Sequence, residues 1–78
     1  MKLERLITLR NERHLSQDDI AKYLNISKIQ YYRYEYGAKV IPLECLIKLA
    51  NFYDTSTDYI LELTDTREKY PQNKKITN

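Results

Sequence analysis

The stretch from Ser16 to Gly37, SQDDIAKYLNISKIQYYRYEYG, constrains the fold of this 78-residue chain more than any other part. Ser16 is followed three residues later by Asp19, which approximates a capping box and predicts that a helix begins here. Ser27 predicts the start of a second helix, and Gly37, the only glycine, predicts its left-handed end. We therefore expect two short helices, over residues 17–24 and 28–36.

The two predicted helices are separated only by the Leu24-Asn25-Ile26 junction. Asparagine is the next best residue after glycine for a left-handed turn position, so Asn25 suits a tight turn here. Two helices joined in this way form a helix-turn-helix, whose second helix can lie in the major groove of DNA.

The rest of the chain shows apolar residues at helical spacing and no strand alternation. We expect three more helices, over residues 2–13, 42–53 and 56–63, and therefore an all-α fold. His14 is expected in the turn after the first of them, because histidine enters the left-handed region more readily than most residues. Pro42 suits a first helical turn, and Ser56 suits a helix start. For residues 42–53 the predicted inward stripe is Leu43, Leu46, Ile47, Ala50 and Tyr53.

The composition changes at Thr64. The remaining stretch, TDTREKYPQNKKITN, has only Tyr70 and Ile76 as sizeable apolar residues, contains a proline and shows no periodicity. We therefore expect one domain over residues 1–63, followed by a flexible tail over residues 64–78.

Several classes of protein are disfavoured by composition. One cysteine and one histidine exclude a disulfide framework and a zinc site. The lone His14 and Cys45 fall on different predicted elements, so we expect no enzyme, metal, cofactor or small-molecule ligand. The opening MKLERLITLR carries charges throughout, which predicts no signal or membrane span and a cytoplasmic location. The net charge of +2 is only a weak indication of nucleic-acid binding.

The second helix of the motif has two distinct faces, because each helical residue advances by about 100°. Tyr31 and Tyr34 are predicted to face the core. Glu35 lies at the edge of that inner face, where it could pair with Arg10, whose burial on the apolar side of helix 2–13 would be costly without a partner. The displayed face carries Lys28, Ile29, Tyr32, Arg33 and Tyr36.

The displayed side chains suit the reading of base edges. Arg33 and Lys28 can donate to guanine, and Ile29 can contact a thymine methyl group. Tyr32 can reach a phosphate or lie against a sugar. There are two alternatives to a base-reading face. One is an ordinary solvated helix face, and the other is a protein-docking face built on the exposed Ile29, Tyr32 and Tyr36. Steep salt dependence of binding would favour DNA over a protein partner.

Three segments, LSQDDIAKYLNIS, RYEYG and IPLECLIKLANFYDTSTDYIL, together resemble the Cro/C1-type, or Xre-like, helix-turn-helix family of phage and bacterial regulators. The resemblance covers residues 3–63. It implies a compact five-helix, lambda-repressor-like domain with the second helix of the motif in the major groove. It further implies a sequence-specific transcriptional regulator of double-stranded DNA, with repression by operator occlusion as the expected mode.

The resemblance also assigns roles to single positions. By position in the family motif, the base contacts would be Lys28, Ile29, Tyr32 and Arg33. The phosphate contacts would be Gln17, Ser27, Tyr36 and Lys39. The family ion pair would be Arg10 with Glu35, which agrees with the partner that the spacing of the residues requires.

Dimerisation would suit a domain this small. A twofold homodimer on a near-palindromic operator would place two recognition helices about 34 Å apart. Helix 42–53 has a second apolar strip, Cys45, Leu49 and Phe52, which we expect to be buried within the same chain. The alternative is that this strip belongs to a dimer interface, which would then be formed by Phe52, Thr57 and Ile60. An antitoxin-like role, in which the tail from Thr64 binds a protein, is a further alternative.

Overall fold

The structure is a computed structural model that describes residues 1–69, and these residues contain five helices and no strand. The helices are α1 (Glu4–Glu12), α2 (Gln17–Leu24), α3 (Lys28–Glu35), α4 (Leu43–Phe52) and α5 (Thr57–Ile60). The all-α prediction is confirmed. The part of the predicted tail that covers residues 70–78 lies outside the described residues.

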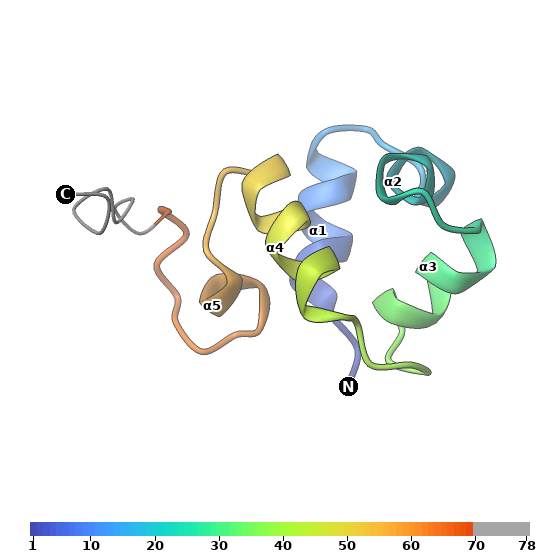
Figure 1. Cartoon of the computed structure of the whole chain (residues 1–78). Helices are drawn as coiled ribbons and strands as arrows, with labels where there is room; N and C mark the ends of the chain where they lie inside the picture. The colour runs from blue at the N-terminus through green and yellow to red at the C-terminus, as the bar shows by residue number, and fades with distance from the viewer. Residues whose placement is uncertain (70–78) are drawn as a thin grey trace, which may run out of the picture.

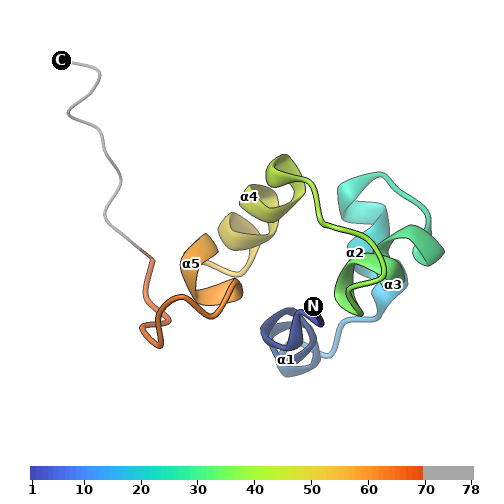
Figure 2. The ribbon, with the colours of Figure 1, turned by 90° about the horizontal axis from the view of Figure 1, so that it is seen from below.

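The helices surround one apolar core. α2 packs against α3, α4 packs against α5, and α1 contacts both α3 and α5. Figures 1 and 2 show α2 and α3 together at one end of the molecule, with α5 and the segment after it at the other. Each helix contributes a side chain that is at most 1% exposed, namely Leu6, Ile20, Tyr31, Leu49 and Ile60. The core therefore holds the helix-turn-helix against the other three helices.

The helices at both ends of the described chain are shorter than predicted. α1 begins at Glu4, because the preceding Leu3 is buried and its backbone N–H donates to the Glu35 carbonyl at 2.8 Å. α5 ends at Ile60, because Glu62 has a positive φ of 63° and turns the chain away. Ser56 is its N-cap, with its hydroxyl accepting from the Tyr59 backbone N–H. Pro42 likewise precedes α4 rather than lying in its first turn.

The predicted inward stripe of α4 is wrong at two positions. Leu43 is 69% exposed and Ile47 is 45% exposed. Leu49, which belongs to the second strip, is fully buried, while Cys45 and Phe52 pack partly against the core. The buried stripe is thus Leu46, Leu49, Ala50 and Tyr53, which keeps helical spacing but is rotated relative to the prediction.

Every helix is followed by one residue in the left-handed conformation, with φ between 55° and 80°: His14, Asn25, Gly37, Asp54 and Glu62. Four of these ends also carry the backbone bond of a Schellman motif, from Leu15 to Arg10, Ile26 to Ala21, Thr55 to Ala50 and Leu63 to Asp58. The predictions for His14, Asn25 and Gly37 are confirmed.

The start of α2 is a complete capping box. The Ser16 hydroxyl accepts from the Asp19 backbone N–H at 3.0 Å, and the Asp19 carboxylate accepts from the Ser16 backbone N–H at 2.8 Å. These bonds to Ser16 lower the pKa of Asp19. The sequence signal for this helix start is confirmed.

The predicted domain boundary at Thr64 is wrong for residues 64–67. The Thr64 carbonyl accepts from the Arg5 guanidinium at 2.6 Å, and the Arg67 carbonyl accepts from the buried Thr55 hydroxyl. The Arg67 side chain pairs with Glu12 on α1, and this bond lowers the pKa of Glu12. Polar contacts rather than apolar burial hold this segment, so its low hydrophobicity gave no sign of attachment.

The core contains two buried tyrosine hydroxyls, those of Tyr31 and Tyr53, that have no hydrogen-bond partner among the described residues. Burial raises the pKa of Tyr31 strongly, and the negative charge of Glu35 adds to this effect. Burial likewise raises the pKa of Tyr53 to about 12. Both groups therefore favour the folded state only while the unfolded chain keeps its tyrosines protonated.

Substitution of Asn25 tests the left-handed turn. Asn25→Ala should lower the free energy of unfolding by about 1 kcal/mol, because a Cβ without a compensating polar group is strained at φ 61°. Asn25→Gly should leave it nearly unchanged, since glycine adopts this conformation freely. Urea denaturation of the two variants provides the comparison, and equal losses would show that the asparagine side chain matters for another reason.

The decrease in the free energy of unfolding at alkaline pH should depend on Tyr31. Above about pH 10 the unfolded state loses tyrosine protons that the folded state retains, so the free energy of unfolding should fall by about 1.4 kcal/mol per pH unit for each tyrosine. Below that pH the contribution is fully present. Tyr31→Phe should make the fall markedly shallower, whereas Tyr32→Phe on the exposed face of α3 should not. Urea titrations between pH 8 and 11.5 measure both slopes, and identical slopes in the two variants would contradict this account.

Candidate nucleic-acid interface

The two faces of α3 are divided as the sequence predicts. Tyr31, Tyr34 and Glu35 are buried, whereas Lys28 and Arg33 are exposed. Ile29 is 65% exposed, which is unusual for a large aliphatic side chain, and the rings of Tyr32 and Tyr36 are about half exposed. The face that α3 presents to solvent thus combines cations with apolar and aromatic groups.

The start of α3 is capped by Ser27, whose hydroxyl accepts from the Gln30 backbone N–H at 3.1 Å. The Gln30 side-chain amide in turn donates to the Tyr34 hydroxyl at 3.0 Å, one turn along the helix. Ile26, just before the cap, packs against the core. These contacts give α3 a defined start next to α2.

A buried polar network fixes α3 against α1 and α2. The Arg10 guanidinium donates to both oxygens of the Glu35 carboxylate, at 2.8 and 3.2 Å, and to the Leu15 carbonyl at 3.0 Å. The Gln17 side-chain amide donates to the same carboxylate at 3.0 Å. The bond to Glu35 raises the pKa of Arg10. The predicted ion pair is confirmed, and it joins three helices rather than two.

Gln17 is therefore placed differently from a freely solvated glutamine. Its amide nitrogen has two N–H groups, and the bond to Glu35 uses one of them. The second remains available, so the side chain is held at the first turn of α2 with donor capacity to spare. Its contact with a phosphate stays a prediction.

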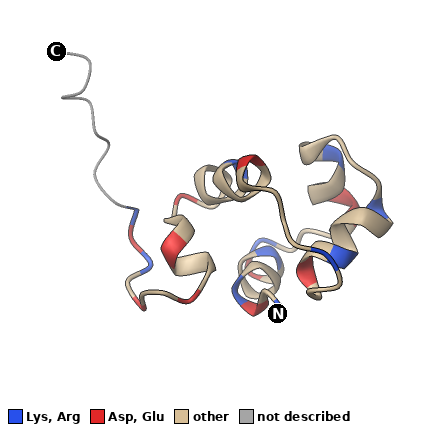
Figure 3. Cartoon of the chain, turned by 60° about the horizontal axis from the view of Figure 1, so that its bottom comes forward, with Lys and Arg blue, Asp and Glu red and all other residues tan. Residues whose placement is uncertain are grey.

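Three cations on α3 or in the loop after it form no ion pair with any residue among 1–69. Among residues 1–69, ion pairs are made by Arg5, Arg10, Lys22 and Arg67. Lys28, Arg33 and Lys39 form none with a described residue, and Figure 3 shows Lys and Arg segments at the α2–α3 end of the molecule. Unpaired exposed cations can bind phosphate without first breaking an internal bond.

The first three residues lie against the end of α3, which the sequence did not suggest. The Lys2 ammonium nitrogen lies 4.9 Å from the centre of the Tyr36 ring, and that ring lies 4.7 Å from the Tyr32 ring. A Cβ on Gly37 would collide with the backbone of Met1. This contact is long-range in sequence, so neither helical periodicity nor motif spacing could reveal it.

The residues predicted for a dimer interface differ in exposure. Phe52 and Thr57 are partly exposed, and the Phe52 ring packs against Tyr23 with ring centres 4.8 Å apart. Ile60 is 0% exposed, so its assignment to an interface is wrong: the side chain fills the core of its own chain. Val40, at 91%, and Leu43, at 69%, are exposed apolar side chains between α3 and the first turn of α4.

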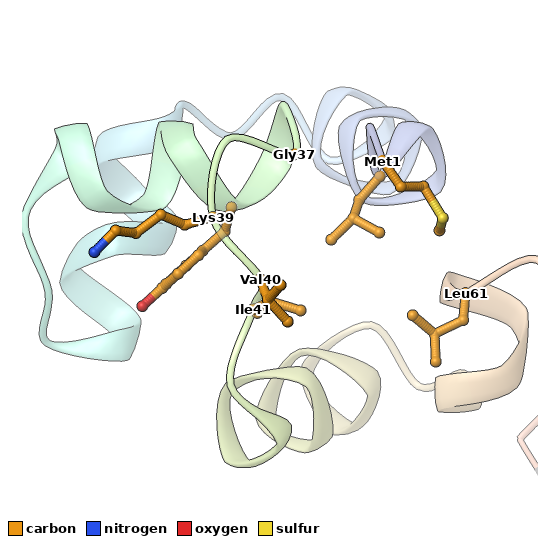
Figure 4. Close-up of a pocket in the computed structure, with 8 residues that line it drawn as sticks. Met1, Gly37, Lys39, Val40, Ile41 and Leu61 are labelled. Carbon is orange, nitrogen blue, oxygen red and sulfur yellow. The ribbon is translucent and has the colours of Figure 1, made fainter.

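A cavity of about 200 Å³ lies beside the loop after α3. Figure 4 shows Met1 and Leu61 on one side of it and Val40 and Ile41 on the other, while the Lys39 side chain extends away from Met1 and Leu61.

Within residues 1–69 there is no cluster of three or more potential metal ligands. No helix in that part of the chain is long and apolar enough to cross a membrane.

The chain is similar to known regulators over nearly its whole length. Residues 6–60 match the Helix-turn-helix family. Over 76 residues the chain is 38% identical to the uncharacterized HTH-type transcriptional regulator YobD of Bacillus subtilis (strain 168), covering 97% of this chain and 68% of YobD. It is 36% identical over 72 residues to the HTH-type transcriptional regulator AnsR of the same organism, covering 92% of this chain and 62% of AnsR.

A third relative in that organism, the uncharacterized HTH-type transcriptional regulator YqaE, is 34% identical over 77 residues, with 96% of this chain and 66% of YqaE covered. The chain thus spans about two thirds of the length of these relatives. No solved structure matches it significantly. The family match and these relatives agree with the five-helix fold: the chain belongs to the helix-turn-helix family of DNA-binding transcriptional regulators.

Proposed function

We propose that this protein is a cytoplasmic repressor that binds a near-palindromic operator as a homodimer and occludes a promoter. The observation that carries the proposal is the exposed face of α3. It presents Lys28 and Arg33, which have no ion-pair partner among residues 1–69, together with Ile29, on a helix whose buried face is fixed by Glu35. A rigid helix with such a surface suits insertion into the major groove.

Within this proposal, four side chains on α3 read the bases. Arg33 is the candidate for a bidentate bond to guanine O6 and N7, and Lys28 can donate to a second guanine. Ile29, one of the most exposed large apolar groups on this side, contacts a thymine methyl group. Tyr32 lies one turn after Lys28 and meets the edge of the groove.

Phosphates on either side of the groove would be held by Gln17, Ser27, Tyr36 and Lys39. Gln17 retains one amide N–H beyond its bond to Glu35, so it can bind a phosphate without losing its internal contact. Lys39 lies in the loop after α3, where its backbone N–H donates to the Arg33 carbonyl at 3.2 Å. That bond folds the loop back along the helix and keeps the cation near the groove.

A homodimer would supply the second recognition helix. Phe52 and Thr57 keep partial exposure and stay candidates for its interface. Val40 and Leu43 add exposed apolar surface next to α3, and covering it by a twofold-related copy would remove that surface from water. The two recognition helices would then face successive major grooves, about 34 Å apart.

Selection from a random pool of duplex DNA, at two salt concentrations, tests the proposed operator. The expected result is an inverted-repeat consensus that is enriched at low salt and lost at high salt, because phosphate contacts release counterions. A consensus of one half-site would contradict the dimer alone. No enrichment by folded protein would contradict operator binding and favour a protein partner for the face of α3.

Two alanine variants separate base reading from phosphate binding. Arg33→Ala should cost about 1–3 kcal/mol on the selected operator and relax preference at one base position. Gln17→Ala should weaken operator and unrelated DNA to a similar extent, since a phosphate contact carries no sequence information. Titrations of both variants against the operator and its single-base variants measure the difference, and the same loss of specificity in both would refute these roles.

A further inference from the structure

The first residues of the chain are anchored against the end of α3. The Leu3 side chain is buried, and its backbone N–H donates to the Glu35 carbonyl at 2.8 Å. The Met1 backbone occupies the space that a side chain on Gly37 would fill. Lys2 lies between these two anchored residues, so its backbone is fixed at the end of the recognition helix.

The Lys2 side chain extends over the exposed face of that helix. Its ammonium nitrogen lies 4.9 Å from the centre of the Tyr36 ring, within the range of a cation–π contact. The Tyr36 ring stacks on Tyr32, with ring centres 4.7 Å apart. Lys2 is exposed and forms no ion pair within residues 1–69. The row from Tyr32 through Tyr36 to Lys2 therefore continues the displayed face beyond the end of α3.

The electrostatics of α3 favour cations at this end. The N-terminal end of a helix attracts phosphate through its free N–H groups, and the C-terminal end, with its free carbonyls, repels it. On α3 the C-terminal end also holds the Glu35 carbonyl, which already accepts from Leu3. A strand of DNA that borders the groove at this end meets favourable charge only from nearby cations, which are Arg33 in the last turn of α3, Lys39 in the following loop and Lys2.

We propose that Lys2 is a phosphate-binding residue of the DNA interface, positioned by the Tyr36 ring at the C-terminal end of the recognition helix. The proposal rests on the proposed DNA-binding function and extends it to a segment outside the helix-turn-helix. Because the contact is to phosphate, Lys2 contributes affinity and register but no base preference.

A merely structural role for Lys2 predicts a different outcome. If the ammonium group only stabilised the end of α3 and the Tyr36 ring, its removal would change unfolding and leave the salt dependence of DNA binding as it was. A phosphate contact changes the slope of the logarithm of the association constant against the logarithm of salt concentration by about 0.9, and the proposed dimer would make this contact twice.

The test measures that slope for the full chain on the selected operator and on unrelated duplex DNA. Lys2→Gln removes one contact from each subunit of the proposed dimer, so it should reduce the slope by about 1.8 and weaken binding to both DNAs by roughly 25–100-fold at 0.1 M salt, with the difference shrinking towards 1 M. Lys2→Arg should restore the slope. Lys69→Gln removes the same charge on the segment after α5, at the other end of the molecule from α3 (Figures 1 and 2), and should leave the slope unchanged.

Positioning by Tyr36 is measured by a double-mutant cycle. In a Tyr36→Leu background the effect of Lys2→Gln should be smaller than in the wild type, because the ammonium group has lost the ring that holds it. A Lys2→Gln slope equal to that of the wild type would overturn the phosphate contact, and an undiminished effect in the Tyr36→Leu background would overturn the positioning. Wild-type protein without salt-dependent DNA binding would overturn the proposed function as well, which distinguishes the two failures.

Discussion

The bond between Arg10 and Glu35 is the interaction on which the rest of the molecule depends. The Glu35 carboxylate is fully buried and accepts hydrogen bonds from Arg10 of α1 and Gln17 of α2. An unpaired charge at this depth would cost about 3–5 kcal/mol, so the three helices are stable only in the arrangement that satisfies it. That arrangement sets the rotation of α3 about its own axis, and hence which of its side chains meet DNA.

The parts of this structure that could be predicted from sequence are those decided within a few residues. The capping box at Ser16, the left-handed Asn25 and the end of α3 at Gly37 each depend on local backbone chemistry. The division of α3 into two faces follows from helical geometry. The partner of Arg10 could also be inferred, because a cation on an apolar helix face needs a nearby carboxylate to offset the loss of its hydration.

The parts that could not be predicted depend on contacts between distant segments. α4 has apolar residues on most of its surface, so its spacing allowed two stripes, and packing in the core selected the one that contains Leu49. The same packing buries Ile60 and removes it from the surface. Lys2 and Arg67 are held by a ring and a carboxylate far along the chain, and no local pattern indicates such partners.

Only one of the five left-handed residues that follow the helices is a glycine. Histidine, asparagine, aspartate and glutamate accept the left-handed conformation at the other four ends, so conformation alone does not demand a glycine. Gly37 differs because the Met1 backbone lies where its side chain would be. The single glycine is therefore needed because two backbone segments approach each other closely. Replacement of Gly37 by any other residue would displace the beginning of the chain before it disturbed α3.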